Sequence, residues 1–417
     1  MTAAKPYTLG TRAPAEIAAP ESVDALAAVL GACDRSGRAA VLFGGRTLQG
    51  LGHSPARFDV AIDCTRLCRV LEHEPRDLTI AVESGCTVAA LDAALAACAQ
   101  FVPLDAPRAA TATIGGTLAS GWLGPRRTRY GSPRDLVIGM TAVLPDGTVA
   151  KTGGMVVKNV TGYDLCKLYI GSLGTLAAIA SVNFKTLPRP AARRLAVASL
   201  PEGTRARTVA QLGTLNSQPA AALIVRGFAK SIAGADGADG RVLVLLEGSQ
   251  HGVDAATREL RSALGAAGVP ETQLIDREAG DAFARVIDAY VESLGSRSVT
   301  YRSGGLPDEA TPRLDAFARV ARANKLAVET IEDLCSGDVI ARVSARLVGE
   351  LAERAVSFDG ARRTALFGAR VVAAPEKLRD RLDAWGAPPL SLPLMRALKT
   401  RFDPRGTLAP GRFVGGL

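Results

Sequence analysis

The N-terminal half of the chain combines short apolar runs with two segments of helical spacing. In residues 16–33 apolar side chains recur every three or four positions, Ser22 is a candidate N-cap, and Gly31 lies near the expected end. Residues 88–98 form a second expected helix, made of small side chains. The expected strands cover residues 39–43, 59–63, 78–83, 136–144, 148–152 and 177–186. Because strands and helices mix without strict strand–helix–strand alternation, the pattern predicts an α+β domain.

Beyond residue 190 the pattern becomes an alternation of short apolar strands with helices rich in alanine and arginine. The expected elements are strands at 222–228, 242–247, 299–302 and 365–373, and helices at 254–267, 279–294 and 308–324. This alternation predicts a separate α/β domain. A last expected helix, at 394–402, is followed by the sequence FDPRGTLAPGRF.

The composition is that of a globular protein. Of the 417 residues, 47% are apolar and 22% are charged, and the length exceeds that of one ordinary domain. There is no run of about 18 uncharged apolar residues to span a bilayer. The N-terminus has no apolar stretch typical of a secretory signal, so we expect a cytoplasmic protein.

Positive charge is concentrated in PRRTRYGSPR, residues 125–134, within a net charge of +9. Such a run can meet phosphates or an acidic partner, although most basic runs are solvated surface. No aromatic–basic alternation or known recognition motif accompanies it, so nucleic acid is not an expected partner.

Cysteines and histidines are too scattered to predict a metal centre. The seven cysteines form no CxxC pair, and Cys64 and Cys68 have no second pair to complete a zinc site, so we expect reduced, mostly buried thiols. The three histidines, His53, His73 and His251, are dispersed. We therefore expect no metal, and no general base or other catalytic residue can be assigned.

Three glycine-rich passages are candidate ligand contacts. The first, FGGRTLQGLG at 43–52, follows an expected strand, and the amides of such a loop can form an anion-binding concavity, with an ordinary turn as the alternative. Its spacing matches neither the dinucleotide fingerprint nor the nucleotide-triphosphate loop. The second is TIGGTLASG at 113–121, and the third, at 151–178, holds five glycines. Glycine at this density is typical of tight turns or of close approach by a large or phosphorylated ligand.

These passages, in this order, resemble the FAD-binding domain of the vanillyl-alcohol oxidase type, over residues 16–190 and 394–413. Within that superfamily, PRRTRYGSPRDLVIG and GGMVVKNVTGYDLCKLYIGSLGTL resemble the FAD-binding E subunit of bacterial glycolate oxidase. The resemblance implies the α+β class, with a PCMH-type FAD-binding domain at 1–190 and a second α/β cap domain at 191–375. It also implies that the C-terminal segment, 376–417, returns to the FAD domain.

The resemblance further implies which residues contact FAD. Counterparts in the first passage, expected at the diphosphate, are Phe43, Gly44, Gly45, Arg46, Thr47, Leu48, Gly50 and Gly52. Counterparts in and before the second passage, expected at the diphosphate and the flavin edge, are Pro107, Thr113, Ile114, Gly115, Gly116, Ser120 and Gly121. Counterparts expected at the isoalloxazine and adenine side are Arg127, Tyr130, Gly131, Asp135, Lys158, Asn159, Gly162, Tyr163, Gly174, Thr175 and Leu176. Backbone amides of glycine loops suit phosphate oxygens because charge-assisted hydrogen bonds are short and strong.

Departures from the family's pattern change the expected chemistry. Relatives with covalent flavin carry histidine directly after the paired glycines, where this chain has Arg46, so non-covalent FAD is expected. Relatives that oxidise D-2-hydroxy acids, including the D subunit of the same complex, hold a metal with a HxxGDGNxH-like segment that this chain lacks. The tail reads AlaProGly at 409–411 where many relatives have AsnProGly, so one contact near the flavin is in doubt.

The resemblance implies an FAD-binding subunit of a glycolate oxidase or dehydrogenase complex. In such a complex a hydride passes from the Cα of glycolate to flavin N5 and yields glyoxylate, with the metal on a catalytic D subunit. The electrons leave through an iron–sulfur subunit to the quinone pool. This chain has no cysteine spacing for its own cluster, so that partner is expected, with at most peripheral association with the inner membrane through the complex.

Two alternatives stay open. One is a free-standing FAD-dependent 2-hydroxy acid dehydrogenase, in which Arg226 and Arg302 anchor the substrate carboxylate unless they are ordinary salt-bridge arginines. The other is a non-catalytic scaffold that only stabilises the complex. The presence of bound FAD distinguishes the scaffold from the other hypotheses. The FAD-binding subunit and the free-standing dehydrogenase predict a yellow protein, whereas the scaffold predicts a colourless one.

Overall fold

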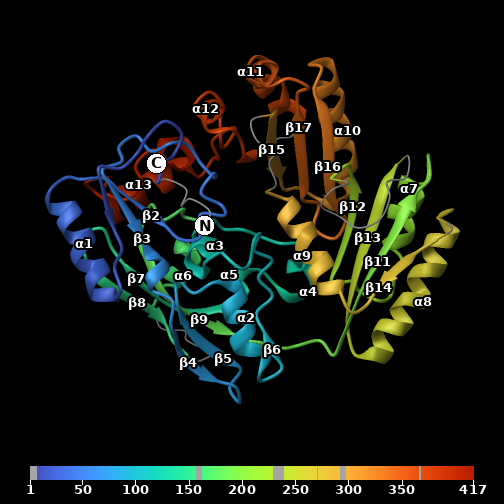
Figure 1. The fold of residues 1–417 in the computed structure, drawn as a ribbon, viewed down its shortest axis with the longest axis horizontal. Coiled ribbons are helices and arrows are strands. Elements are labelled where there is room, and N and C mark those ends of the chain that lie inside the picture. The colour runs from blue at the N-terminus through green and yellow to red at the C-terminus, as the bar shows by residue number, and fades with distance from the viewer. Residues whose placement is uncertain (1–6, 156–161, 229–238, 270, 292–296, 366–367) are drawn as a thin grey trace. The chain divides into compact units, whose positions relative to one another are not determined.

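The computed structural model describes residues 7–155, 162–228, 239–269, 271–291, 297–365 and 368–417, and the chain divides into two compact units (Figure 1). Unit 1 comprises Met1–Leu123, Ser132–Arg189 and Glu376–Leu417, and unit 2 comprises Gly124–Gly131 and Pro190–Pro375. The C-terminal segment thus groups with the N-terminal residues. The basic segment Gly124–Gly131 groups with unit 2, although both of its neighbours in sequence belong to unit 1.

Unit 1 is built on two sheets. The larger has the order β4-β5-β9-β7-β8 and is antiparallel throughout. Its strands are β4 (Val70–Glu74), β5 (Thr79–Glu83), β9 (Ala178–Lys185), β7 (Val137–Val143) and β8 (Val149–Gly153). The smaller sheet is parallel, with the order β1 (Glu16–Ala18), β3 (Val60–Asp63) and β2 (Ala40–Phe43). A short antiparallel pair joins β6 (Gln100–Phe101) to β10 (Leu187–Pro188).

Helices bury their apolar sides against these sheets. The longest, α1 (Val23–Arg35), begins where expected, because the Ser22 side chain accepts a hydrogen bond from the Ala25 amide at 3.1 Å. Leu26 and Leu30 of α1 share one buried cluster with residues of β2 and β3. The other helices of unit 1 are α2 (Val88–Ala96), α3 (Ile114–Ala119), α5 (Pro133–Leu136), α6 (Leu165–Tyr169), α12 (Glu376–Arg379) and α13 (Leu392–Phe402).

The C-terminal tail extends the smaller sheet at β2. The amide of Ala40 donates to the carbonyl of Thr407 at 2.7 Å, and the amide of Ala409 donates back to the carbonyl of Ala40 at 2.8 Å. Asp403, which is 3% exposed, accepts hydrogen bonds at 2.8 Å from the amides of Thr407 and Leu408. The residues that follow run beside the first glycine-rich passage.

Unit 2 is one eight-stranded antiparallel sheet with helices. The strand order is β14-β11-β13-β12-β16-β17-β15-β18. The strands are β11 (Ala192–Leu200), β12 (Ala221–Arg226), β13 (Gly240–Gly248), β14 (Gln273–Ile275), β15 (Ser298–Ser303), β16 (Ala327–Asp333), β17 (Val339–Ser344) and β18 (Arg370–Ala373). The helices are α4 (Arg127–Tyr130), α7 (Arg205–Leu212), α8 (Gln250–Ala266), α9 (Ala279–Ala289), α10 (Pro307–Ala323) and α11 (Val348–Ala365). Leu260 and Leu264 of α8 pack on the apolar side chains of β11 and β13.

Most expected elements form, with shifted ends. The helix expected at 279–294 is α9, which ends at Ala289, and the strand expected at 365–373 begins only at Arg370. Residues 16–18 form the edge strand β1, so the helical segment expected at 16–33 is wrong there, and the exposed edge strand β4 was not predicted because it has no continuous buried apolar run. The strands β11, β16 and β17 of unit 2 were also not predicted. The second glycine-rich passage contains the helix α3, since Thr113 supplies an N-cap.

Asp333, at the end of β16, makes the stability of unit 2 depend on pH. The residue is 3% exposed and accepts hydrogen bonds from the Cys335 amide and the Ser336 hydroxyl. Burial raises the pKa of Asp333 from 3.8 to about 6, so the folded state favours the protonated acid. The resulting stabilisation is present below about pH 4 and is lost as the pH rises through about 6.

We therefore expect Asp333→Asn to raise the melting temperature relative to wild type above about pH 7, and to have much less effect near about pH 4. The pH-dependent part of the difference is at most about 3 kcal/mol. Thermal unfolding measured across this pH range tests it. A difference between variant and wild type that stays constant with pH would contradict the raised pKa.

Candidate cofactor-binding site

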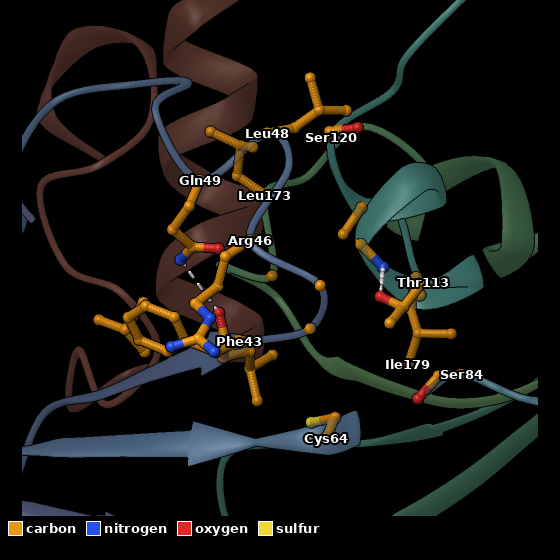
Figure 2. Close-up of a pocket in the computed structure, with 18 of the residues that line it drawn as sticks. Phe43, Arg46, Leu48, Gln49, Cys64, Ser84, Thr113, Ser120, Leu173 and Ile179 are labelled. Atoms are coloured by element: carbon orange, nitrogen blue, oxygen red, sulfur yellow. Dashed lines mark hydrogen bonds between the residues drawn. The ribbon is translucent and has the colours of Figure 1, made fainter. Parts of the chain in front are cut away.

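Segments of unit 1 that are distant in sequence line one cavity (Figure 2). The glycine-rich loop after β2 contributes residues up to Gln49, the start of α3 contributes Thr113 to Ser120, and a third stretch contributes residues from 173 to 179. Arg412 of the tail completes the lining. In Figure 2 the first loop and α3 face each other across the cavity.

The first loop requires glycine for a steric reason. A Cβ atom on Gly44 would overlap the Thr113 hydroxyl, and one on Gly45 would overlap the carbonyl oxygen of Thr111. Glycine therefore allows the loop backbone to lie directly against the residues that begin α3. The next residue, Arg46, has a φ of +58°, an uncommon conformation for a residue other than glycine, and the chain turns sharply there.

The start of α3 brings polar groups to the same cavity. The Thr113 hydroxyl oxygen accepts a hydrogen bond from the Gly116 amide at 3.3 Å and so caps the helix. Ser84, which is 2% exposed, has a hydroxyl with no hydrogen-bond partner among the described residues. A buried hydroxyl without a hydrogen-bond partner lowers the folding stability, and a hydrogen bond to a ligand or water would remove this cost. Ser84 is therefore a candidate ligand contact.

Arg412 brings a buried positive charge to the cavity. It is 3% exposed, and its Nη2 donates hydrogen bonds to the carbonyls of Gln49 at 3.2 Å and Leu51 at 2.8 Å. Within the described part of the chain no carboxylate pairs with it. Burial lowers the pKa of Arg412 to about 9, and the positive charge of Arg379 adds to the effect. An anion in the cavity would compensate this charge.

The cavity collects most of the residues expected from the first two passages. Those that line it are Phe43, Gly44, Gly45, Arg46, Thr47, Leu48, Thr113, Gly115, Gly116 and Ser120, with Gly174 from the third passage. Expected residues of unit 1 that do not line it are Gly50, Gly52, Pro107, Ile114, Gly121, Asp135, Gly162, Tyr163, Thr175 and Leu176. Ile114 is core, the Asp135 carboxylate accepts hydrogen bonds from Ser132, and Tyr163 is 92% exposed. For this second group, contact with FAD stays a prediction.

The remaining expected contacts fall elsewhere. Arg127, Tyr130 and Gly131 belong to unit 2, where the Tyr130 hydroxyl donates to the Glu247 carboxylate at 2.8 Å. Lys158 and Asn159 lie outside the described residues. Their roles at the flavin also stay predictions.

The sequence analysis missed several lining residues. They are Val41, Leu42, Gln49, Cys64, Ser84, Ala119, Leu173, Ala177, Ile179 and Arg412. Gln49 lies inside the first passage and Arg412 directly follows the ProGly of the tail, so neighbouring motifs could have indicated both residues as lining the cavity. No motif lies next to Ser84. Cys64 is not a nucleophile here, because burial raises its pKa to about 12 and keeps the thiol protonated.

Comparison with known proteins identifies the class of this one. A family model described as an FAD binding domain matches residues 14–153. Among solved structures, p-cresol methylhydroxylase is similar at 17% identity and a TM-score of 0.73, over 95% of this chain and 88% of that one. Alkyldihydroxyacetonephosphate synthase is similar at 15% identity and a TM-score of 0.67, over 95% and 77%. The expected fold class is confirmed, as are the cofactor, FAD, and the class of FAD-dependent oxidoreductase.

Sequence relatives correct one expectation. The chain is 26% identical to glycolate oxidase subunit GlcD of Bacillus subtilis over 96% of its length and 88% of that protein. It is 39% identical to subunit GlcE of Escherichia coli, but over only 30% of this chain and 35% of that protein. The assignment to the E subunit is therefore wrong for the chain as a whole. It relied on motifs within one stretch of the FAD domain, and such local likeness does not extend along the rest of the chain.

Other relatives are matched over part of their length. The mitochondrial D-lactate dehydrogenase of Arabidopsis thaliana is 34% identical, and this chain covers 33% of it. In the described structure no helix is long and apolar enough to cross a membrane. Among the same residues, no group of three or more histidine, cysteine, aspartate or glutamate side chains is placed to hold a metal ion.

Proposed function

We propose that this chain is the FAD-bearing subunit of a multisubunit oxidoreductase that oxidises a small 2-hydroxy acid, with glycolate, converted to glyoxylate, as the first candidate. The observation that carries the proposal is the cavity of unit 1. There the backbone at Gly44 and Gly45 lies directly against the residues that begin α3, and the buried Arg412 lines the same cavity. Relatives named as a glycolate oxidase subunit, a D-lactate dehydrogenase and a D-2-hydroxyglutarate dehydrogenase support the substrate class.

The residues of this chain would bind and orient the cofactor. FAD supplies the hydride chemistry when bound. The amides of the first loop and the guanidinium of Arg412 suit the two negative charges of its diphosphate. The Ser84 hydroxyl offers one further hydrogen bond. With Arg46 at the position of a tethering histidine, the proposed binding is non-covalent.

We further propose that the electrons leave through an iron–sulfur partner subunit towards the quinone pool. Two relatives are named as subunits of glycolate oxidase, which supports an assembly of several chains. The scattered cysteines of this chain favour a partner as the carrier of a cluster. Association with the inner membrane would then be made through partner subunits.

A free-standing FAD-dependent 2-hydroxy acid dehydrogenase is the second candidate, favoured by the relatives named D-lactate dehydrogenase and D-2-hydroxyglutarate dehydrogenase, neither of which is named as a subunit. It would have to bind the substrate carboxylate itself. Of the two arginines expected as anchors, Arg226 pairs with Asp239 at 3.4 Å and Arg302 pairs with Asp338 at 2.5 Å. A non-catalytic scaffold without flavin is the third candidate, and purified protein that contains no FAD would favour it.

We expect the purified chain to be yellow, to contain about one FAD per chain, and to release it on acid precipitation. The complex copurified through a tag on this chain should pass electrons from glycolate to a quinone analogue, whereas the chain alone should not turn over. An absorbance spectrum, a flavin count and a dye-reduction assay measure these properties. Turnover of glycolate by the chain alone would replace the proposal with the free-standing enzyme, and colourless protein would replace it with the scaffold.

A further inference from the structure

A second cavity of unit 1 lies between α13 on one side and α6 with the residues that follow it on the other. Its apolar lining includes Leu168 and Ile170 on the α6 side, and Met395, Leu398 and Phe413 on the α13 side. The cavity has a volume of about 290 Å³, and all of these residues belong to unit 1. A hollow with apolar walls can receive side chains or a ligand from another molecule.

The helix α13 is poorly covered by the rest of unit 1. None of its residues is buried, and the Leu394 side chain is 64% exposed. Leu390, just before the helix, is completely exposed. A surface helix of a globular protein normally buries a stripe of apolar side chains against its own core. The apolar side chains of α13 are therefore available to another surface.

The surroundings of this cavity are positively charged. Arg134 and Lys167 line it, and Arg401 is exposed on α13. Among the described residues no carboxylate pairs with Arg134 or Arg401, whereas Lys167 lies 3.5 Å from the Asp164 carboxylate. Residues 384–402 contain no aspartate or glutamate. A partner that brings acidic groups would complement this charge.

A single stretch of chain separates the second cavity from the cofactor cavity. Residues 171–172 and 175–176 line the second cavity, and residues 173–174, between them, line the cofactor cavity. The Thr175 carbonyl accepts a hydrogen bond from Lys399 of α13 at 2.8 Å, so α13 contacts this stretch directly. A protein bound at α13 would therefore lie next to the cofactor site, and electron transfer requires such closeness between two redox centres.

We propose that the second cavity, together with the exposed Leu394 and Arg401, is the surface on which an acidic iron–sulfur subunit docks. The identity of the partner rests on the proposed function, which places the electron carrier outside this chain. A protein can insert an apolar side chain between α13 and Leu168, whereas a flat bilayer surface would leave this hollow unfilled. Arginine, methionine and aromatic side chains, all present here, are enriched at the centres of protein–protein interfaces.

The test is purification of the complex through a tag on the full chain, followed by counts of iron, acid-labile sulfide and FAD per chain. We expect Leu394→Asp and Arg134→Glu each to lower the iron count at least about fivefold, with FAD content and melting temperature unchanged. Both positions are exposed, so neither change disturbs the core. Leu306→Asp, at a leucine of unit 2 that is 65% exposed, and Arg285→Glu, at an exposed position of α9, are the matched controls and should keep the wild-type iron count.

An iron count equal to wild type in both Leu394→Asp and Arg134→Glu would overturn the surface and leave the proposed function intact. A wild-type complex without iron and sulfide would contradict the electron-carrying partner of the proposed function, and with it the occupant proposed for this surface. Sedimentation with phosphatidylglycerol vesicles that both substitutions abolish would assign the surface to a membrane instead. A dimer of this chain that Leu394→Asp dissociates in light scattering would assign it to a second copy.

Discussion

Replacing Gly45 with alanine is expected to lower the affinity for FAD at least about 100-fold. The new Cβ would overlap the carbonyl oxygen of Thr111, a backbone atom that no rotamer change can move. The first loop would have to separate from the start of α3, so the two halves of the cavity would no longer face the same ligand. Overpacking of this kind costs about 1–3 kcal/mol of folding stability in addition. Flavin retention on gel filtration and the dissociation constant measured by fluorescence report the effect.

Gly154→Ala is the matched control. A Cβ at Gly154 would meet nothing within 4 Å, and the residue lies in the third glycine-rich passage of the sequence. It should bind FAD like the wild type. If Gly45→Ala retains its flavin as tightly as Gly154→Ala does, the close contact between the first loop and Thr111 is not needed for the site.

Replacing Arg412 with methionine is expected to weaken FAD binding by roughly 10- to 100-fold. Methionine keeps much of the side-chain length but removes the positive charge and the hydrogen bonds to the carbonyls of Gln49 and Leu51. The loss should be smaller for Arg412→Lys, which keeps the charge without the planar fork. Titration of the apoprotein with FAD at low and high salt measures both the affinity and the electrostatic share of it.

Arg405→Met provides the comparison for this experiment. Arg405 belongs to the same tail, its side chain is 57% exposed, and it pairs with Asp34 at 2.9 Å without lining the cavity. Its replacement should leave flavin affinity unchanged. Similar affinities for Arg412→Met and Arg405→Met would remove Arg412 from the cofactor site.

Much of the first unit could be predicted from local sequence. Ser22 marked the start of α1, and the apolar runs marked β2, β3, β5, β7 and β9. Glycine was informative at Gly44 and Gly45 because only a residue without Cβ fits there. For the same reason the first passage could be singled out as a candidate ligand contact without knowledge of the residues it packs against.

Contacts made across long sequence separations could not be predicted in this way. Ser84 lies at the end of an ordinary buried strand, and nothing in its neighbours indicates that its hydroxyl lacks a partner. Tyr163 belongs to a motif of the resemblance, yet it is 92% exposed. The motifs alone also led to the wrong subunit. The similarity to GlcE covers only 30% of the chain, whereas the similarity to GlcD covers 96% of it.

By itself the sequence determined where the backbone can turn tightly and be approached closely, because backbone freedom and Cβ size are properties of each residue. The resemblance of its motifs to an FAD-binding domain implied the cofactor. Only the tertiary structure decided where charge is left uncompensated. Arg412 is buried beside the first loop, and among the described residues no carboxylate pairs with it. Burial and pairing depend on what the fold brings to within a few ångströms, and spacing along the chain does not specify that.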